Sequence, residues 1–207
     1  MMHRQGQAYS LESREVYDHD FSYLHEGVAI PHGIYDLKNN TAYINIGTSK
    51  DTSEFACDSI KRWWYRRGRY DYSTASSILI VADGGGSNSS RHYLFKQDLQ
   101  KLSDEIGVEL RVAHYPPYTS KWNPIEHRVF PHVTRVLEGF VLESYDMVKE
   151  LIETAQTKTG LKIKASIIDK VYKTGRKVAK CFKDTMKIVF DDKLGKWNYV
   201  AKPAVVK

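Results

Sequence analysis

An apolar run that ends at an acid and three glycines restricts the fold of this chain most. Residues 78–82 read ILIVA, and they lead directly into Asp83 and the glycines of 84–86. The run opens with four large apolar residues, three of them β-branched, which is typical of a strand buried on both faces of a mixed or parallel sheet. Glycine ends such a strand. The sequence therefore predicts an α/β protein with Asp83 at the carboxyl end of a central strand.

The following residues predict the order helix, strand, helix. A helical stripe spaced by four, three and four residues ends at Gly107, and alternating residues at 108–113 predict a second strand. Asn123 is a good N-cap, and Pro124 suits the first helical position. Eight residues into that helix, Pro131 removes a backbone hydrogen bond and is expected to kink it. The first stripe consists of Phe95, Leu99, Leu102 and Ile106.

This order predicts a shared site for Asp83 and Glu126. Strands joined by a crossover helix run parallel, so residues that follow them meet at one edge of the sheet. Two carboxylates there suit a hard cation such as Mg²⁺. Each acid also has a plainer interpretation, since Asp83 fits turn chemistry and Asn123 with Glu126 resembles a capping box. Together, on these elements, they favour a metal site.

The rest of the chain predicts three segments. Residues 1–26 are polar and expected to be poorly ordered, 27–140 form the core, and 141–207 form an extension packed on it. Within the core, 28–37 and 41–46 predict a hairpin, and a helix is predicted from near Thr52. For Trp63 and Trp64 we favour a place in the core over a platform that stacks on DNA bases. The extension holds a helix, a strand at 161–167 with a basic face, and a closing hairpin between 186 and 199.

Composition bounds the partners and the compartment. The 207 residues carry 31 Lys and Arg against 25 Asp and Glu, a formal charge of +6 with a pI near 9.1, which mildly favours a polyanionic partner. Cys57 and Cys181 have no metal-binding spacing and indicate a reducing compartment. No apolar run approaches the ~20 residues of a membrane span. We expect a cytoplasmic protein without membrane contact, associated with the nucleoid when bound to DNA.

Two strings give the chain a specific resemblance. Residues 82–88, ADGGGSN, and 117–128, PYTSKWNPIEHR, resemble the Rhodopirellula-type DDE transposase family of bacterial insertion sequences. Shorter stretches are also similar to that family, so the resemblance extends over most of 18–200. These stretches are 29–36, Trp63 with Trp64, 158–162 and 197–199.

The resemblance implies a ribonuclease-H-like fold whose Asp, Asp and Glu bind two divalent ions, Mg²⁺ or Mn²⁺. It implies DNA strand cleavage and strand transfer, with Asp83 and Glu126 in the places of the second and third acids. The first acid belongs on a central strand that we do not recognise. Asp18 and Asp20 lie in no apolar strand, and Asp36 precedes a turn signal. We therefore expect an N-terminally truncated chain that lacks this strand, is inactive alone, and forms a homo-oligomer or is complemented by another transposase fragment.

Candidate DNA contacts surround Glu126 and follow the basic strand. Cations there neutralise phosphates without exact geometry, although solvated surface is an equally good interpretation for the lysines of the strand. For Trp122 we favour a structural anchor over contact with a displaced base, and for His127 a positioning role over proton transfer. Two other functions remain open: a non-catalytic DNA-binding or inhibitory remnant of a transposase, and a decayed reading frame or one half of a frameshifted product. The candidate contacts are Lys121, Trp122, Asn123, His127, Arg128, Lys162 and Lys164.

Overall fold

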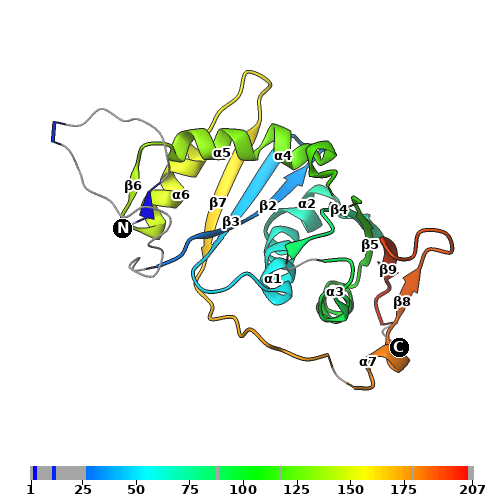
Figure 1. Cartoon of the computed structure of the whole chain (residues 1–207). Coiled ribbons are helices and arrows are strands. Elements are labelled where there is room, and N and C mark those ends of the chain that lie inside the picture. The colour runs from blue at the N-terminus through cyan, green and yellow to red at the C-terminus, as the bar shows by residue number, and fades with distance from the viewer. Residues whose placement is uncertain are drawn as a thin grey trace. The chain divides into compact units, whose positions relative to one another are not determined.

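The computed structural model describes residues 2–3, 11–12, 27–86, 89–116, 118–178 and 180–204 (Figure 1). Its described part is a mixed α/β structure, as predicted, with two mixed sheets and a two-stranded ribbon. Backbone proximity divides it into two compact units. The first comprises Met1–Lys50 and Pro124–Val171, called here the Glu126 unit, and the second comprises Asp51–Asn123 and Tyr172–Lys207, called the Asp83 unit. Our three-segment division follows other boundaries and stays a prediction.

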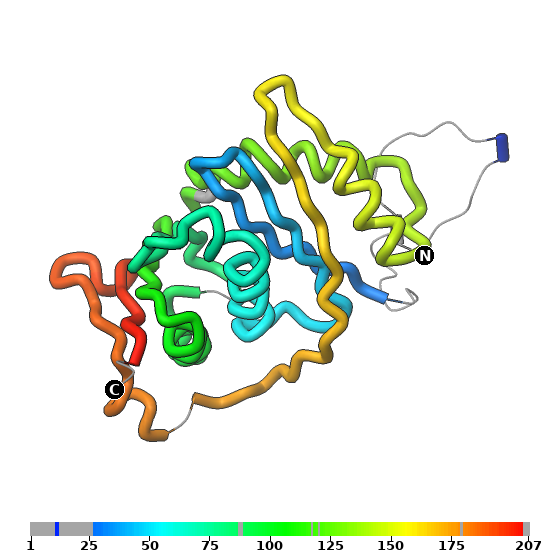
Figure 2. The backbone as a smooth tube through the Cα atoms, turned by 180° about the vertical axis from the view of Figure 1, so that it is seen from behind, coloured from blue at the N-terminus to red at the C-terminus, as the bar shows by residue number. Residues whose placement is uncertain are grey.

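The Glu126 unit is built on a three-stranded sheet. It has the order β2 (Ile30–Asp36), β3 (Thr41–Gly47), β7 (Lys162–Ile168), with β2 antiparallel and β7 parallel to β3. Figure 2 shows these three strands side by side. The predicted hairpin is confirmed. Asp36 closes its turn, because its Oδ1 accepts hydrogen bonds from the backbone N–H groups of Lys38 and Asn39, both at 3.1 Å.

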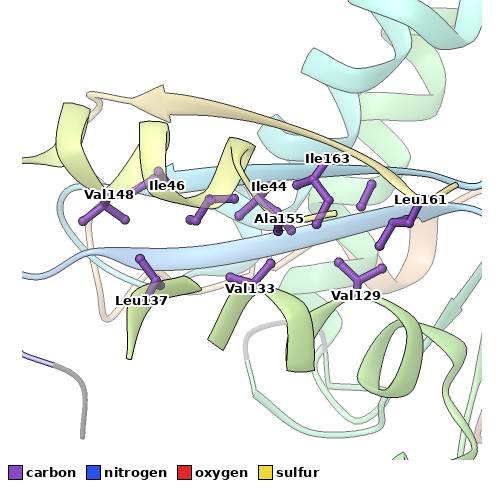
Figure 3. Packing of buried hydrophobic residues seen from close by; sticks show 11 residues of the cluster. Ile44, Ile46, Val129, Val133, Leu137, Val148, Ala155, Leu161 and Ile163 are labelled. Atoms are coloured by element: carbon purple, nitrogen blue, oxygen red, sulfur yellow. The ribbon is translucent and has the colours of Figure 1, made fainter. Parts of the chain in front are cut away.

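Two helices cover this sheet with an apolar layer. They are α5 (Phe130–Leu137) and α6 (Tyr145–Glu153), and the Ser144 hydroxyl caps α6 by accepting from the Met147 N–H at 3.1 Å. Figure 3 shows side chains of the α5 segment directed at the strands. α6 is the helix that the sequence predicts in the extension, and it ends at Glu153. The buried cluster is Ala42, Ile44, Ile46, Val129, Val133, Leu137, Val148, Ile152, Ala155, Leu161 and Ile163.

The helix that begins at Pro124 is interrupted as its proline predicts. It forms α4 (Pro124–Arg128), and α5 begins only at Phe130, with Val129 between them at φ −124°. Pro131 lies in the first turn of α5, where its missing N–H costs nothing. A short ribbon completes the unit, with β1 (Met2–His3) antiparallel to β6 (Val141–Leu142).

The Asp83 unit is built on a four-stranded sheet. Its order is β4 (Ser77–Ala82), β5 (Glu109–His114), β9 (Asn198–Ala201), β8 (Ile188–Phe190). The first two strands are parallel, and the other neighbours are antiparallel. The predicted parallel pair and the closing hairpin are both confirmed.

Helices of the Asp83 unit pack on one another and on this sheet. They are α1 (Ser53–Trp63), a π-helical turn (Trp64–Gly68), α2 (Arg69–Asp71), α3 (Tyr93–Ile106) and α7 (Phe182–Thr185). The Thr52 hydroxyl caps α1, and α3 ends at Gly107 in the left-handed conformation with φ +69°. Trp63 and Trp64 are both buried, which confirms their place in the core.

One prediction about β4 is wrong. The strand is not buried on both faces, because the side chains of Leu79 and Val81 are 65% and 38% exposed. Leu79 and Val81 lie on one face of the strand, and Arg111 of β5, which pairs with Leu79, is exposed as well, so the described residues leave this face of the sheet open. β4 is also an end strand, since it pairs only with β5. In the same way β2 ends the three-stranded sheet. The prediction for residues 1–26, with Asp18 and Asp20, falls largely outside the described residues.

Candidate active site

Asp83 lies where the sequence predicts, directly after β4, and its side chain is half-buried. The glycines that follow let the chain turn closely against the neighbouring strand end. A Cβ atom on Gly84 would lie 3.2 Å from the carbonyl oxygen of Tyr115, and Gly86 has φ +66°. The backbone N–H of Tyr115 also donates to the Ala82 carbonyl at 2.9 Å. Ser87 and Asn88 lie outside the described residues.

Two side chains of the same unit hold Asp83. One binds the carboxylate of Asp83, and the other binds its backbone carbonyl. Asn123, which is 7% exposed, donates from Nδ2 to Asp83 Oδ1 at 3.1 Å. The ring of His114 lies 3.0 Å from the Asp83 carbonyl oxygen through Nδ1. A carbonyl oxygen only accepts, so Nδ1 carries the proton. The position and the orientation of the carboxylate are therefore both restrained.

A buried chain of side chains continues from His114. With its proton on Nδ1, the neutral ring accepts at Nε2 from the Tyr199 hydroxyl, 2.9 Å away. Burial lowers the pKa of His114, and the hydrogen bond to Asp83 offsets part of this. The Lys96 ammonium lies 4.4 Å from the centre of the Tyr199 ring and donates to the Ser90 carbonyl at 2.5 Å. Burial lowers the pKa of Lys96 to about 8.

Three side chains around Asp83 were not predicted from the sequence: His114, Tyr199 and Lys96. One signal was available for His114, since it ends β5 as Asp83 follows β4, and parallel neighbours finish at the same edge. Tyr199 and Lys96 come from distant parts of the chain. Tyr199 lies in the family-like stretch 197–199, but neither its local sequence nor that of Lys96 indicates a contact with His114 or the Asp83 segment.

Glu126 belongs to the other unit. It lies half-buried on α4, and α4 packs against β2 at a glycine. A Cβ atom on Gly33 would lie 2.8 Å from Cδ1 of Ile125, so only glycine lets the helix approach this closely. His127 and Arg128 are exposed on the same helix. The meeting of Asp83 and Glu126 at one site stays a prediction.

The donor chemistry suits a hard divalent cation, because both acids offer half-buried carboxylate oxygens. Within neither unit, however, do three His, Cys, Asp or Glu side chains of the described residues gather as a metal site. Asp36, the weakest substitute for a first acid, is engaged by the hairpin turn and is 9% exposed.

The remaining candidates lie on exposed surfaces of the two units. Lys121 and Trp122 occupy a 3₁₀ turn (Ser120–Trp122) before Asn123. The anchoring role that we favoured for Trp122 is wrong, since its side chain is 66% exposed. Lys162 and Lys164 project from β7 on the exposed face, while Ile163 between them is 5% exposed, as the alternation predicts.

A family model described as Rhodopirellula transposase DDE domain matches residues 1–203. The chain belongs to this family. The resemblance of its two strings is thereby confirmed, and the transposase family is one of DNA-acting enzymes of the polynucleotidyl-transferase type that generally use divalent metal ions. No curated protein and no solved structure matches this transposase domain. None of its described helices is long and apolar enough to cross a membrane.

Proposed function

We propose that this transposase domain cleaves and transfers DNA strands, with Asp83 and Glu126 as two of its three metal-binding acids. One observation carries the proposal: Asp83, at the carboxyl end of a parallel strand, is held by Asn123 at its carboxylate and by His114 at its backbone. Strand ends of this kind are where α/β proteins place their sites. Hydrogen bonds that hold both the carboxylate and the backbone of an acid orient it as a metal ligand.

The ions are Mg²⁺ or Mn²⁺, held by the carboxylates of Asp83 and Glu126. When bound, such ions lower the pKa of water for attack on a phosphodiester and stabilise the leaving oxygen. The protein groups orient the ligands. Asn123 leaves the second oxygen of Asp83 available by binding only Oδ1, and the neutral ring of His114 keeps the turn after β4 in place.

The remaining acid, the first aspartate of the family, is proposed to come from a further strand. β4 and β2 each end a sheet, and β4 carries exposed apolar side chains with no charge or proline along its edge. Such edges accept another strand. In a ribonuclease-H-like arrangement this strand brings the first aspartate beside Asp83, from another segment or from a second transposase chain. The described units alone are then expected not to cut DNA.

DNA contacts are proposed on both units. Lys162 and Lys164 present ammonium groups on the exposed face of β7, and Lys121 does so beside the active-site turn. Phosphate contacts of this kind set position and carry no sequence information. Asn123 acts through Asp83, while Trp122, His127 and Arg128 are exposed enough to reach DNA or its phosphates.

Metal binding tests the role of the two acids. Adding Mn²⁺ to the isotope-labelled protein broadens NMR resonances of residues near a bound ion. We expect this around Asp83, and we expect Asp83→Asn to weaken Mn²⁺ binding at least about tenfold, because removing a ligand exceeds the effect of removing its supporting group. Glu126→Gln should also weaken it. The matched control is Asp192→Asn, an exposed aspartate of the same unit.

The proposal fails if Mn²⁺ binding is unchanged in both acid variants. Nicking of supercoiled plasmid with Mg²⁺ or Mn²⁺ then tests the need for the first aspartate. Cutting by this chain alone that Asp83→Asn abolishes would confirm the catalytic role of Asp83 and contradict the need for a further strand.

A second candidate function is that of a non-catalytic DNA-binding protein that inhibits an active transposase. It is favoured by the observation that neither unit, within its described residues, assembles three potential metal ligands. It predicts DNA binding that is unaffected by Mn²⁺ and by Asp83→Asn. Mn²⁺ binding at Asp83 would argue against it.

A further inference from the structure

The loop between β5 and α4 displays two aromatic side chains that the fold does not use. Tyr118 is fully exposed, and Trp122 is 66% exposed. Tyrosine and tryptophan are large amphipathic groups that proteins concentrate where they bind partners. Two of them four residues apart, in a nine-residue connection beside a proposed catalytic acid, call for a binding explanation.

The loop is held firmly at its base and along its course. At its start, Tyr115 donates to the Ala82 carbonyl, and at its end Asn123 donates to Asp83. Between them, the hydroxyl of Thr119 donates to the Pro116 carbonyl at 2.7 Å, and the Trp122 N–H donates to the Thr119 carbonyl at 2.9 Å. The two aromatic residues thus belong to a loop whose first and last residues are bonded to the segment that ends at Asp83.

The backbone at Tyr118 supports a functional reason for this display. Its φ is +66°, a left-handed conformation that is uncommon and unfavourable for a bulky residue other than glycine. Such conformations persist where surrounding structure imposes them, and they cluster at binding and active sites. Glycine or asparagine usually occupies such a position, but here it is occupied by an exposed tyrosine.

Charge identifies the partner. The Lys121 ammonium lies 5.4 Å from the centre of the Trp122 ring, so a cation adjoins an exposed aromatic face. Alternation of cations with aromatic faces is the pattern of proteins that bind single-stranded nucleic acids, where the cation meets phosphate and the ring stacks on a base. A duplex covers its base faces with neighbouring bases and offers only their edges.

We propose that Tyr118 and Trp122 form a stacking platform for unpaired bases next to the phosphodiester that is cut. This proposal rests on the proposed function, which places the cut at Asp83. It adds that the DNA bound there is single-stranded or unpaired. Lys121 contacts the phosphate of the same nucleotides. Asn123 links the platform to Asp83 and so sets the platform beside the acid.

Binding to a fluorescently labelled oligothymidine strand and to a blunt duplex of equal length, in EDTA, tests the platform. We expect Trp122→Ala to weaken single-strand binding about tenfold and to change duplex binding less than twofold, with Tyr118→Ala similar but smaller. Trp122→Phe should retain most of the affinity, because a ring remains. Lys121→Ala should weaken both forms alike, since both carry phosphates.

Tyr70→Ala is the matched control, because Tyr70 is 64% exposed in the same unit and lies away from this loop in the sequence. It should leave both affinities unchanged. Equal losses for strand and duplex in Trp122→Ala, or no loss in either, overturn the platform. So does a change in self-association with no change in DNA binding, which would make the loop a protein interface.

The measurement contains no metal and requires no cutting, so its failure is separate from failure of the proposed function. Asp83→Asn should keep the preference for single strands while it loses Mn²⁺ binding. Both side chains are exposed, so the alanine variants are expected to unfold at the wild-type temperature, and thermal unfolding checks this.

Discussion

The two units of this protein bury different chemistry. The Glu126 unit packs its sheet and helices through a continuous cluster of aliphatic side chains (Figure 3). Among the described residues that are buried and polar, only Asp36 and Asn45 belong to it. The Asp83 unit holds the others, including His114, Asn123 and Lys96.

This difference shows which unit fixes its side chains by directional contacts. Apolar packing is strong but non-directional, whereas a buried hydrogen bond fixes both distance and angle. The unit with the buried polar network is the one that holds Asp83. Its chain from Tyr199 through His114 restrains the acid to one position, at the expense of desolvating several polar groups.

We expect the largest loss of stability when a side chain of the aliphatic cluster is truncated. Ile44 is 1% exposed in β3, and Ile44→Ala should lower the free energy of unfolding by about 4 kcal/mol through lost burial and the cavity left behind. Urea unfolding measures it. Leu37→Ala, at a site that is 56% exposed in the adjoining turn, is the control and should change stability by less than about 0.5 kcal/mol. Equal effects at the two sites would contradict the aliphatic core.

The next effect concerns a buried ion pair of the Asp83 unit. Arg176 donates from both guanidinium nitrogens to Asp98, at 2.9 and 2.7 Å, and Asp98 is 5% exposed. Arg176→Met leaves this carboxylate with a neutral donor, the Ser53 hydroxyl at 2.6 Å. We expect a loss of about 3 kcal/mol, because a buried charge loses its counter-charge. Urea unfolding again measures it.

An exposed ion pair of the same unit gives the matched control. Lys61 lies 2.6 Å from Glu105, with the two side chains 39% and 45% exposed, and Lys61→Met should cost less than about 1 kcal/mol. The double variant Asp98→Asn with Arg176→Met should regain part of the loss, since no isolated charge remains. If Arg176→Met costs no more than Lys61→Met, the unit does not depend on buried polar contacts.

The smallest effect is a pH dependence from Lys96. Burial lowers the pKa of Lys96 to about 8, against about 10.4 for a free lysine. Between these values the unfolded chain binds more protons than the folded one, so this lysine makes stability rise with pH there. Burial also raises the pKa of Cys57, which makes stability fall with pH. The useful quantity is therefore the difference in the free energy of unfolding between wild type and Lys96→Met.

That difference should shift in favour of wild type by about 1 kcal/mol between pH 7.5 and pH 10, after allowance for partial solvation. Lys101→Met, at an exposed lysine of the same helix, is the control and should show no such shift. A flat difference for Lys96→Met would mean that water reaches the ammonium. The Asp83 unit would then bury its polar groups less completely than its contacts indicate, and would differ less from the Glu126 unit.

Local sequence patterns predicted the elements well. The run at 78–82, the stripe from Phe95 and the alternation at 108–113 gave β4, α3 and β5 with the correct parallel pairing. Helices and strands can be predicted in this way because each has a characteristic spacing of apolar side chains along the sequence. Pro131 likewise marked the break between α4 and α5. Which face of a sheet is covered was not predictable in this way, and so the exposure of Leu79 was missed.

The sequence by itself determined the family, the strand that delivers Asp83, and the helix that carries Glu126, because these depend on short runs of adjacent residues. Only the tertiary structure decided what holds Asp83. His114 and Asn123 reach it from two separate segments, Tyr199 reaches His114 from a third, and Arg176 reaches Asp98 across 78 positions. Hydrogen bonds between distant segments leave no periodic trace in a sequence, since they depend on how elements pack and not on which residues are neighbours.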